Sequence, residues 1–435
     1  MKKMKYLLTL ICLAAVLTSC KESNENDTPS DIQTTRTVMV YMAGENNLTV
    51  TNGVRFLRND LNEMIEGSKL LGKDQRLLIF VDSLNTSSSS KKGTPFIIEV
   101  HDGKTTVLHQ YDSNFYSCDP AKFKEVLQFM INEAPAKSYG LVLWGHASGW
   151  TVINDSIVGT RETRAYGEDD GKNSGVNSIK WMNITQMARA LKELPKLEFI
   201  FADCCNMMCA EVGYELRDVT NYLIGSPAEI PGDGAPYDEI IPYLYKSGSQ
   251  LYKNIIDTYY DYYIEDFEGD YFLDGYSVPL SVIETKYMEQ LAQATHNILD
   301  KFTDGYPSYP QSPDLSGIVF YLYYDVPVLY DMRAFIKLNT SEADFLQWDK
   351  VYQQAVPYYR MSLRWMTIYE ALEYSMYSFI QDSSINGCVS TFIPRNNRLY
   401  YNGTFHYNKT FNNFGWNRVL DWSRYGWTPN STYSN

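Results

Sequence analysis

Two short polar segments directly follow apolar, strand-like runs, and each contains a residue type that can catalyse a reaction. WGHASGW (144–150) places His146 after LVLW, and ADCCNM (202–207) places two cysteines after LEFIFA. A thiol nucleophile needs a base that lies beside it in space although it is distant in sequence. If the two runs are neighbouring strands, both segments lie at one edge of a sheet. The alternatives are a structural histidine in a glycine-rich turn and small residues at a tight strand-to-helix turn.

The second segment also has features that would activate a thiol. We expect a helix from about Met208 to Arg217, and a cysteine at a helix N-terminus is stabilised as the thiolate by the helix dipole. Backbone N–H groups in the two turns can form an oxyanion hole. Because neighbouring residues point in different directions, one of Cys204 and Cys205 faces the cleft, and the pattern alone leaves open which.

The elements that must position these segments alternate between strands and helices. Continuous apolar runs predict buried strands, and apolar residues at helical spacing predict helices. The expected elements are strands at 37–42, 77–81, 141–144, 197–202 and 222–224, a hairpin around Asp102-Gly103, and helices after Val54, Asp119 and Asn183. This order predicts an α/β fold, with a mainly parallel sheet sandwiched between helices and ligands at the carboxyl ends of its strands.

The chain divides into four segments by pattern: an export signal (1–20), a flexible tether (21–35), a core (36–245) and a C-terminal half (246–435). We expect the C-terminal half to complete the sheet and to add a small subdomain of helices and strands. Its expected elements are Tyr-rich helical segments at about 250–268 and 341–380, and strands at 278–283, 316–323 and 388–393.

The first twenty residues are typical of a secretory signal. Three lysines precede an apolar stretch, Tyr6 to Val16, that is too short to span a membrane. LTSC (17–20) resembles a bacterial lipobox, in which the cysteine is lipidated, so Cys20 is the expected anchor; the alternative is an ordinary signal peptide. The acidic stretch after Lys21 resembles the surface-export signal of Bacteroidetes lipoproteins. We therefore expect attachment to the bacterial outer membrane through a lipid anchor only, at the cell surface.

Composition excludes several classes of protein. The chain has 435 residues, 44% hydrophobic and 21% charged, which is typical of globular domains. With 38 basic and 52 acidic residues its net charge is −14, which argues against a nucleic-acid partner. Two of seven cysteines lie in the signal, and the remaining odd, uneven set fits neither a disulfide framework nor a zinc site. Serine-hydrolase and metalloprotease motifs are absent.

Six segments spread over nearly the whole mature chain resemble the clostripain-like cysteine peptidases, relatives of caspases and gingipains. They are TVMVYMAGENNLT (37–49), LVLWGHASGW (141–150), FADCCNMMCAEVGYEL (201–216), IPGDGAPYD (230–238), PVLYDMRAF (327–335) and GCVSTFIP (387–394). The resemblance implies a caspase-like catalytic core over residues 36–245. It also implies hydrolysis of peptide bonds by a Cys–His dyad.

The resemblance assigns the catalytic groups. Met207 and Glu211 fall at the family's distances from Cys205, which makes Cys205 the nucleophile, and His146 matches the base and acid. Backbone N–H groups of Ala147 and Cys205 are the implied oxyanion donors.

The resemblance also implies a basic specificity. Asp203 and Asp233 match the two acidic residues that line the family's primary specificity pocket, where carboxylates select Arg or Lys. The alternatives are a helix cap for Asp203 and an ordinary turn residue for Asp233. The sequence departs from the family's pattern at three places: Ala147 replaces a usual Gly, Ala235 replaces a usual Trp, and Gly44-Glu45 replaces an Ala-Asp pair. If position 147 requires a positive φ, the alanine there would be strained.

The long segment 151–182 is a candidate for processing, because relatives are often activated by self-cleavage in this region. Lys172 is the first candidate site, followed by Lys180, Arg161 and Arg164; an uncut surface loop is the alternative. Some relatives use calcium, which the acidic run 168–170 could bind, but a solvated loop is favoured. We expect no cofactor and no metal.

The sequence thus predicts a surface-anchored cysteine endopeptidase that cleaves polypeptides after basic residues. The alternative is a catalytically silent peptidase-like lipoprotein that binds a peptide or a partner. Ala147 motivates this alternative, as does a vicinal disulfide between Cys204 and Cys205, which would block the nucleophile.

Overall fold

The computed structural model describes most of the chain after the predicted tether. The described residues are 34–85, 93–150, 166–176, 178–266, 278–302, 315–324, 326–361, 364–368, 375–378, 385–393 and 414–422, and all of them belong to one compact unit. The predicted signal with Cys20, most of the tether, Arg161 and Arg164 lie outside the described residues. Among the helices of the described part, none combines the length and hydropathy that crossing a bilayer requires.

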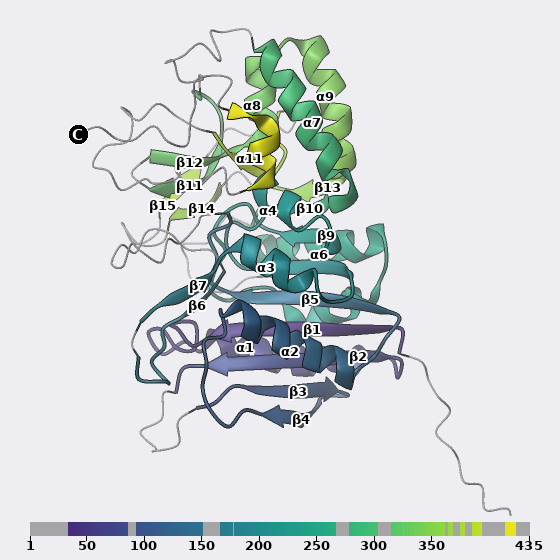
Figure 1. The fold of residues 1–435 in the computed structure, drawn as a ribbon, viewed down its shortest axis with the longest axis vertical. Helices are drawn as coiled ribbons and strands as arrows, with labels where there is room; N and C mark the ends of the chain where they lie inside the picture. The colour runs from purple at the N-terminus through teal and green to yellow at the C-terminus, as the bar shows by residue number, and fades with distance from the viewer. Residues whose placement is uncertain are drawn as a thin grey trace, which may run out of the picture. The chain divides into compact units, whose positions relative to one another are not determined.

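A nine-stranded sheet forms the centre of the fold (Figure 1). From edge to edge its strands are β13 (Tyr358–Arg360), β10 (Leu280–Glu284), β9 (Thr220–Gly225), β8 (Leu197–Asp203), β5 (Ser138–Gly145), β1 (Arg36–Gly44), β2 (Gln75–Ser83), β3 (Phe96–His101) and β4 (Lys104–Gln110). The five central strands, β9 to β2, are parallel, and the outer four pair antiparallel. The predicted mainly parallel α/β sheet is confirmed.

Both faces of the central strands are buried, which explains their uninterrupted apolar sequences. In β1, Met39 and Tyr41 belong to one hydrophobic cluster, and Val40 and Met42 belong to the other. One face is covered by α2 (Pro120–Glu133), α3 (Ile184–Leu191), α4 (Ala210–Glu215) and α7 (Met288–Ile298). The opposite face is covered by α1 (Phe56–Gly67), α5 (Tyr237–Ile240) and α6 (Ser249–Asp261). The sheet is therefore sandwiched between helices, as predicted.

Local sequence signals place several element ends correctly. Asp102 and Gly103 both have positive φ, +50° and +69°, in the turn of the predicted hairpin β3–β4. The Asp119 side chain accepts hydrogen bonds from two backbone N–H groups in the first turn of α2. Asn183 and Gln186 form the predicted capping box of α3.

The remaining elements are helices, small sheets and single turns, most of them in the C-terminal half. The helices are α8 (Met332–Asn339), α9 (Glu342–Ala355) and α11 (Gly415–Leu420). A three-stranded sheet contains β11 (Phe320–Tyr324), β12 (Val326–Asp331) and β16 (Ser390–Phe392). Two further sheets have two strands each: β14 (Arg364–Ile368) with β15 (Ser375–Ser378), and β6 (Tyr166–Asp169) with β7 (Lys180–Met182). Short 3-10 or π turns occur at Ser68–Leu70, Ile241–Tyr245, Tyr262–Asp266, Thr285–Tyr287 and Leu299–Lys301.

The predicted helical segment 341–380 is wrong beyond residue 355. The helix α9 ends at Ala355, and strands β13, β14 and β15 come after it. Pro357 explains the stop, because the residue before a proline is driven away from helical backbone angles. The aromatic residues beyond it favour strands.

Candidate active site

The two predicted catalytic loops lie side by side at the carboxyl end of the sheet. β5 and β8 are neighbours, and Trp144 pairs with Asp203. His146 and Cys205 each lie two residues further on, and both are partly exposed, whereas every other residue of 141–150 and 201–210 is buried. The loops touch: Gly149 has a φ of +67°, and a Cβ there would lie 2.5 Å from the carbonyl oxygen of Asn206. The sheet thus brings the thiol and the imidazole to one edge.

The two adjacent cysteines differ in their exposure to solvent. Cys204 is 1% exposed and belongs to the core cluster of the α2–α3 face, where burial raises the pKa of its thiol well above the usual value. The Cys205 sulfur is partly exposed and accepts a hydrogen bond from the backbone N–H of Ile230 at 3.4 Å. Neither cysteine forms a disulfide in the structure. Cys205 is therefore the cysteine that faces outward.

The prediction that a helix dipole stabilises the Cys205 thiolate is wrong. α4 begins only at Ala210 and has Cys209 as its N-cap residue, and the dipole effect falls off within the first turn. Residues 204–209 are held instead by tertiary contacts, since the N–H of Asn206 donates to Ala228 and that of Met208 donates to Ser226. Cys205 thus lies in a loop between β8 and α4.

Two segments position His146. Its Nε2 lies 2.6 Å from Oδ1 of Asn47, and its backbone carbonyl accepts a hydrogen bond from the N–H of Gly167 at 2.9 Å. With the Asn47 oxygen as the acceptor, Nε2 carries the proton and Nδ1 is the basic nitrogen of the neutral ring. Ala147 is buried and is not among the described residues with positive φ. Replacing the family's glycine therefore creates no backbone strain.

Asp203 is the last residue of β8, two positions before Cys205. It is 3% exposed, and its carboxylate accepts hydrogen bonds from the Tyr237 hydroxyl (2.7 Å), the Tyr259 hydroxyl (2.9 Å) and the N–H of Ala235 (3.2 Å). It does not cap α4, whose N-cap is Cys209. Burial raises the pKa of Asp203, and the three donors offset this effect in part.

Further carboxylates surround Asp203. Asp60, on α1, is 1% exposed, and its Oδ2 accepts a hydrogen bond from the Trp144 indole at 2.5 Å. Burial and the charge of Asp203 raise the pKa of Asp60 well above the usual value. Asp233 is half-buried, and burial raises its pKa too. Gly234 lies between Asp203 and Asp60. Its φ is +63°, and a Cβ at this position would lie only 2.9 Å from Asp203 Oδ2 and 3.0 Å from Asp60 Oδ2.

Comparisons with known proteins agree with this geometry. The sequence model of the clostripain family matches residues 40–427. The chain belongs to the clostripain family. A secreted C11 cysteine protease from Bacteroides thetaiotaomicron, in complex with an irreversible peptide inhibitor, is 28% identical over 90% of this chain and 99% of its own, with a TM-score of 0.71.

Two more solved structures share the fold. An inactive zymogen C11 protease from Parabacteroides distasonis is 24% identical over 88% of this chain and 97% of its own, with a TM-score of 0.68. The Bacteroides thetaiotaomicron C11 protease iotapain is 20% identical over 89% of this chain and 99% of its own, with a TM-score of 0.67. No protein with a curated description matches the chain. Membership of the clostripain family makes the chain a caspase-like C11 cysteine protease with polypeptide substrates.

Two residues of the site, Asn47 and Asp60, were not identified from the sequence. A signal for Asp60 exists: it lies three residues after Leu57 and four before Met64, which are both buried on α1. A polar residue on the apolar face of an amphipathic helix indicates a buried polar contact. Asn47 has no periodic signal, because it lies in an exposed turn, but it belongs to the segment 37–49 that resembles the family, although the resemblance assigns this residue no role.

The two described candidates for self-cleavage, Lys172 and Lys180, are both held by local contacts. The bond after Lys172 is held from both sides: the Lys172 carbonyl accepts from the N–H of Gly175, and the N–H of Asn173 donates to Glu45 at 2.6 Å. Lys180 begins β7, and its ammonium lies 4.2 Å from the ring centroid of Tyr116.

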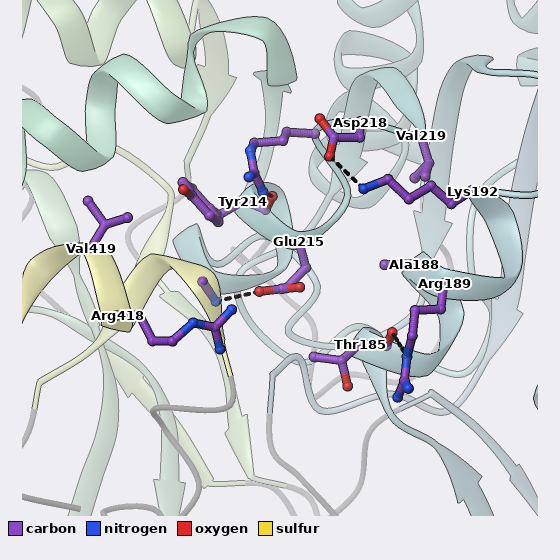
Figure 2. A pocket seen from close by; sticks show the side chains of 12 residues that line it. Thr185, Ala188, Arg189, Lys192, Tyr214, Glu215, Asp218, Val219, Arg418 and Val419 are labelled. Atoms are coloured by element: carbon purple, nitrogen blue, oxygen red, sulfur yellow. Dashed lines mark hydrogen bonds and ion pairs between the residues drawn. The ribbon is translucent and has the colours of Figure 1, made fainter.

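A separate pocket of about 400 Å³ lies between α3, α4 and α11 (Figure 2). Its walls carry mixed charges, from Arg189, Glu215 and Arg418 among others. None of the described candidate catalytic or specificity residues lines it. We therefore assign it no role in the protease site.

Proposed function

We propose that the chain is a cysteine endopeptidase that cleaves polypeptides after Arg or Lys, with Cys205 as the nucleophile and His146 as the base and acid. One observation carries the proposal: these are the two partly exposed side chains of two otherwise buried strand-end segments, and these segments follow neighbouring strands of the sheet.

The reaction can be derived from these groups. His146 takes the thiol proton of Cys205, and the sulfur attacks the scissile carbonyl, whose developing negative charge is stabilised by the N–H groups of Ala147 and Cys205. The imidazolium then gives the proton to the leaving amine. Water hydrolyses the resulting thioester, which releases the carboxylic acid and regenerates the thiol.

The carboxylates support the basic preference. The carboxyl groups of Asp203 and Asp60 face each other across Gly234, and Asp233 is the neighbouring residue. A cationic side chain placed here would favour the ionised form of these groups, whose pKa burial raises. An Arg or Lys side chain that enters here supplies the positive charge that this group lacks.

Fluorogenic amides of Arg, Lys and norleucine, measured with and without reductant, test the proposal. We expect turnover of the Arg or Lys amide, a loss of at least about 1000-fold in Cys205→Ala, and retention of activity in Cys204→Ala. The absence of turnover under all conditions, with retained peptide binding, would instead support the silent binding module.

We further propose that the protein is a surface lipoprotein anchored through Cys20. The lipobox-like sequence 17–20 supports this. Cys20→Ser should move the protein out of the membrane fraction. Persistent membrane association of this variant would contradict the anchor.

Self-cleavage within residues 151–182 is the last part of the proposal. Because the bond after Lys172 is held by Glu45 and Gly175, we place the cut after Arg161 or Arg164. N-terminal sequencing of active protein tests this, and a fully active intact chain would exclude processing.

A further inference from the structure

The turn that follows β1 brings an asparagine to the proposed catalytic base. Oδ1 of Asn47 lies 2.6 Å from Nε2 of His146, although 99 positions separate the two residues in the sequence. Asn47 itself is exposed, and the resemblance to the family assigns it no role. A contact between residues so distant in the chain is set by the fold, so the structure must hold both partners in place.

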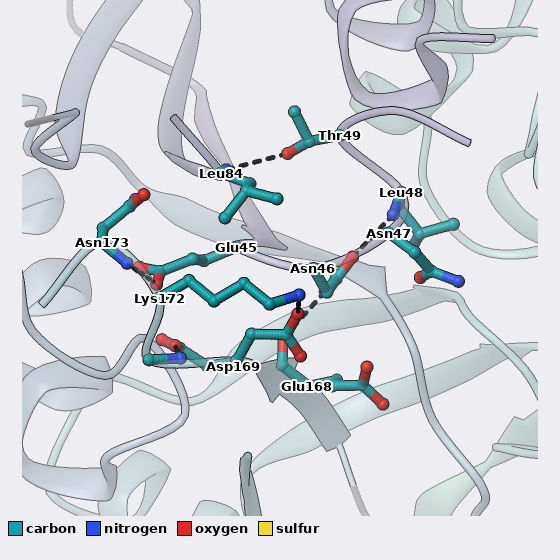
Figure 3. A network of polar contacts seen from close by, with 12 residues as sticks. Glu45, Asn46, Asn47, Leu48, Thr49, Leu84, Glu168, Asp169, Lys172 and Asn173 are labelled. Atoms are coloured by element: carbon teal, nitrogen blue, oxygen red, sulfur yellow. Dashed lines mark hydrogen bonds and ion pairs between the residues drawn. The ribbon is translucent and has the colours of Figure 1, made fainter. Parts of the chain in front are cut away.

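The preceding residue, Asn46, holds this turn in one conformation (Figure 3). Its Nδ2 donates to the carbonyl oxygens of Ala43 (3.1 Å) and Glu168 (2.8 Å), and its Oδ1 accepts from the N–H of Leu48 at 2.8 Å. Asn46 is fully buried. An asparagine side chain that accepts from the backbone two residues further on forms an Asx turn. Asn46 therefore fixes the backbone on both sides of Asn47.

The far end of the turn is attached to the neighbouring elements. Thr49 Oγ1 donates to the carbonyl of Gly44 at 2.6 Å and accepts at 2.9 Å from the N–H of Leu84, the residue after β2. The N–H of Leu57, on α1, donates to the carbonyl of Leu48 at 3.1 Å. Two strands and a helix thus restrict the movement of this turn, and side chains on such supports are positioned more precisely than those on loops alone.

Other contacts hold His146 from the side of β6 and β7. The N–H of Gly167 donates to its carbonyl at 2.9 Å, and the ring centroid of Trp181 lies 6.3 Å from that of the imidazole. The first contact fixes the backbone, and the second limits the space in which the ring can turn. The Asn47 contact adds what these two lack, because it distinguishes between the two ring nitrogens.

We propose that Asn47 is a positioning residue that fixes both the orientation and the tautomer of His146. The asparagine oxygen accepts from Nε2–H, which leaves the lone pair of the neutral ring on Nδ1, the nitrogen that takes the thiol proton of Cys205. Because an amide is neutral, Asn47 orients the ring without stabilising the imidazolium as a carboxylate would. The effect on catalysis rests on the proposed function, but the hydrogen bond does not.

Charged and titratable side chains also occur on the segments that pack around His146. They are Glu45 on the turn, Glu168 and Asp169 on β6, Lys180 on β7, and the thiol of Cys205. Glu45 and Asp169 are fully buried and accept hydrogen bonds from other groups, and Lys180 lies over an aromatic ring. A carboxylate at position 47 would therefore add a negative charge in direct contact with the imidazole.

Amide turnover by Asn47→Ala and Asn47→Asp across the pH range tests the positioning role. Asn47→Ala should lower kcat by about 100-fold, the cost of a misplaced catalytic group, with little change in KM. Asn47→Asp keeps the acceptor and adds a charge that favours the imidazolium. It should therefore recover most of the activity at high pH, with the acid limb of kcat/KM moved upward by about one pH unit or more.

Asn132→Ala, which changes an exposed asparagine on α2, is the matched control and should equal wild type. An unchanged kcat in Asn47→Ala would overturn the proposal. Equal losses in Asn47→Ala and Asn47→Asp, with the pH profile unmoved, would also overturn it, because they would make Asn47 a structural residue only. If the alanine variant does not fold, the pH profile of Asn47→Asp still decides.

Nitrogen NMR of histidine-labelled protein separates this proposal from the proposed function. The His146 signal is identified by its absence from His146→Gln. In the neutral ring, wild type should carry the proton on Nε2, and Asn47→Ala should show a mixture of both tautomers. A proton on Nδ1 in folded wild type would overturn the proposal. The expected spectrum from a protein without turnover would refute the proposed function and leave the orienting role of Asn47 standing.

Discussion

At the scale of single residues, Asp60 is a buried carboxylate that α1 places next to Asp203. Its Oδ2 is held by the Trp144 indole, while Oδ1 has no hydrogen-bond partner among the described residues. It meets Asp203 across Gly234, where a Cβ has no room. If the proposed preference for Arg or Lys holds, we expect Asp60 to contribute to it together with Asp203 and Asp233.

Asp60→Asn should therefore lower kcat/KM for Arg and Lys amides by about 10- to 100-fold, since a hydrogen bond to a charged group contributes about 1.5–3 kcal/mol. The asparagine oxygen can still accept from Trp144. The ratio of Arg to norleucine turnover is the measurement. Asp238→Asn, an exposed acid nearby, is the matched control, and an unchanged ratio in Asp60→Asn would remove Asp60 from the pocket.

At the scale of elements, Glu211 connects α4 to β16. Its Oε1 accepts hydrogen bonds from the Phe392 N–H (2.9 Å) and the Thr391 hydroxyl (3.1 Å), while Oε2 has no partner among the described residues. Burial raises its pKa to about 7. The glutamate thus has a structural role, because it fixes β16 to the helix that follows the Cys205 loop.

This pKa predicts how stability depends on pH. The folded pKa lies above the ordinary value of 4.5, so the folded state holds the proton more tightly. The resulting stabilisation is complete below pH 4.5 and is lost as pH rises through 7, by up to about 3 kcal/mol. Glu211→Gln should remove this dependence and be more stable than wild type at pH 8.5.

Urea unfolding at pH 5.5 and 8.5, in the Cys205→Ala background, measures the effect. Glu66→Gln is the control, because Glu66 is exposed on α1. Equal losses of stability between the two pH values in wild type and Glu211→Gln would show that another group titrates.

Sequence patterns predicted most elements but not the conformation of the catalytic loop. Apolar runs and caps located the central strands and the starts of α2 and α3, because burial and capping are local or periodic signals. Residues 204–206 form a turn in which Asn206 has a φ of +60°, and hydrogen bonds from Asn206 and Met208 to Ala228 and Ser226 hold this loop. No local pattern reveals these tertiary contacts. The motifs located His146 and Cys205; their orienting partners came only from the tertiary structure.

At the scale of the whole molecule, the C-terminal half supplies part of the central sheet. β10 lies between β9 and β13, and it pairs with β9 through Ser281–Gly225 and Val282–Ile224. Leu223 and Ile224 are fully buried. From the strand order we predict that the folding of residues 36–245 depends on the C-terminal half.

A fragment of residues 34–245 should accordingly not fold alone. Removing β10 leaves β9 as an apolar edge strand whose backbone groups are open to pairing with another chain, which favours aggregation. It also removes α6, whose Ile255 and Ile256 are buried against the sheet. Solubility and size-exclusion chromatography measure the outcome. Co-expression with residues 246–435 should restore a soluble complex, whereas a monomeric fragment with a cooperative thermal transition would show that the core is an independent domain.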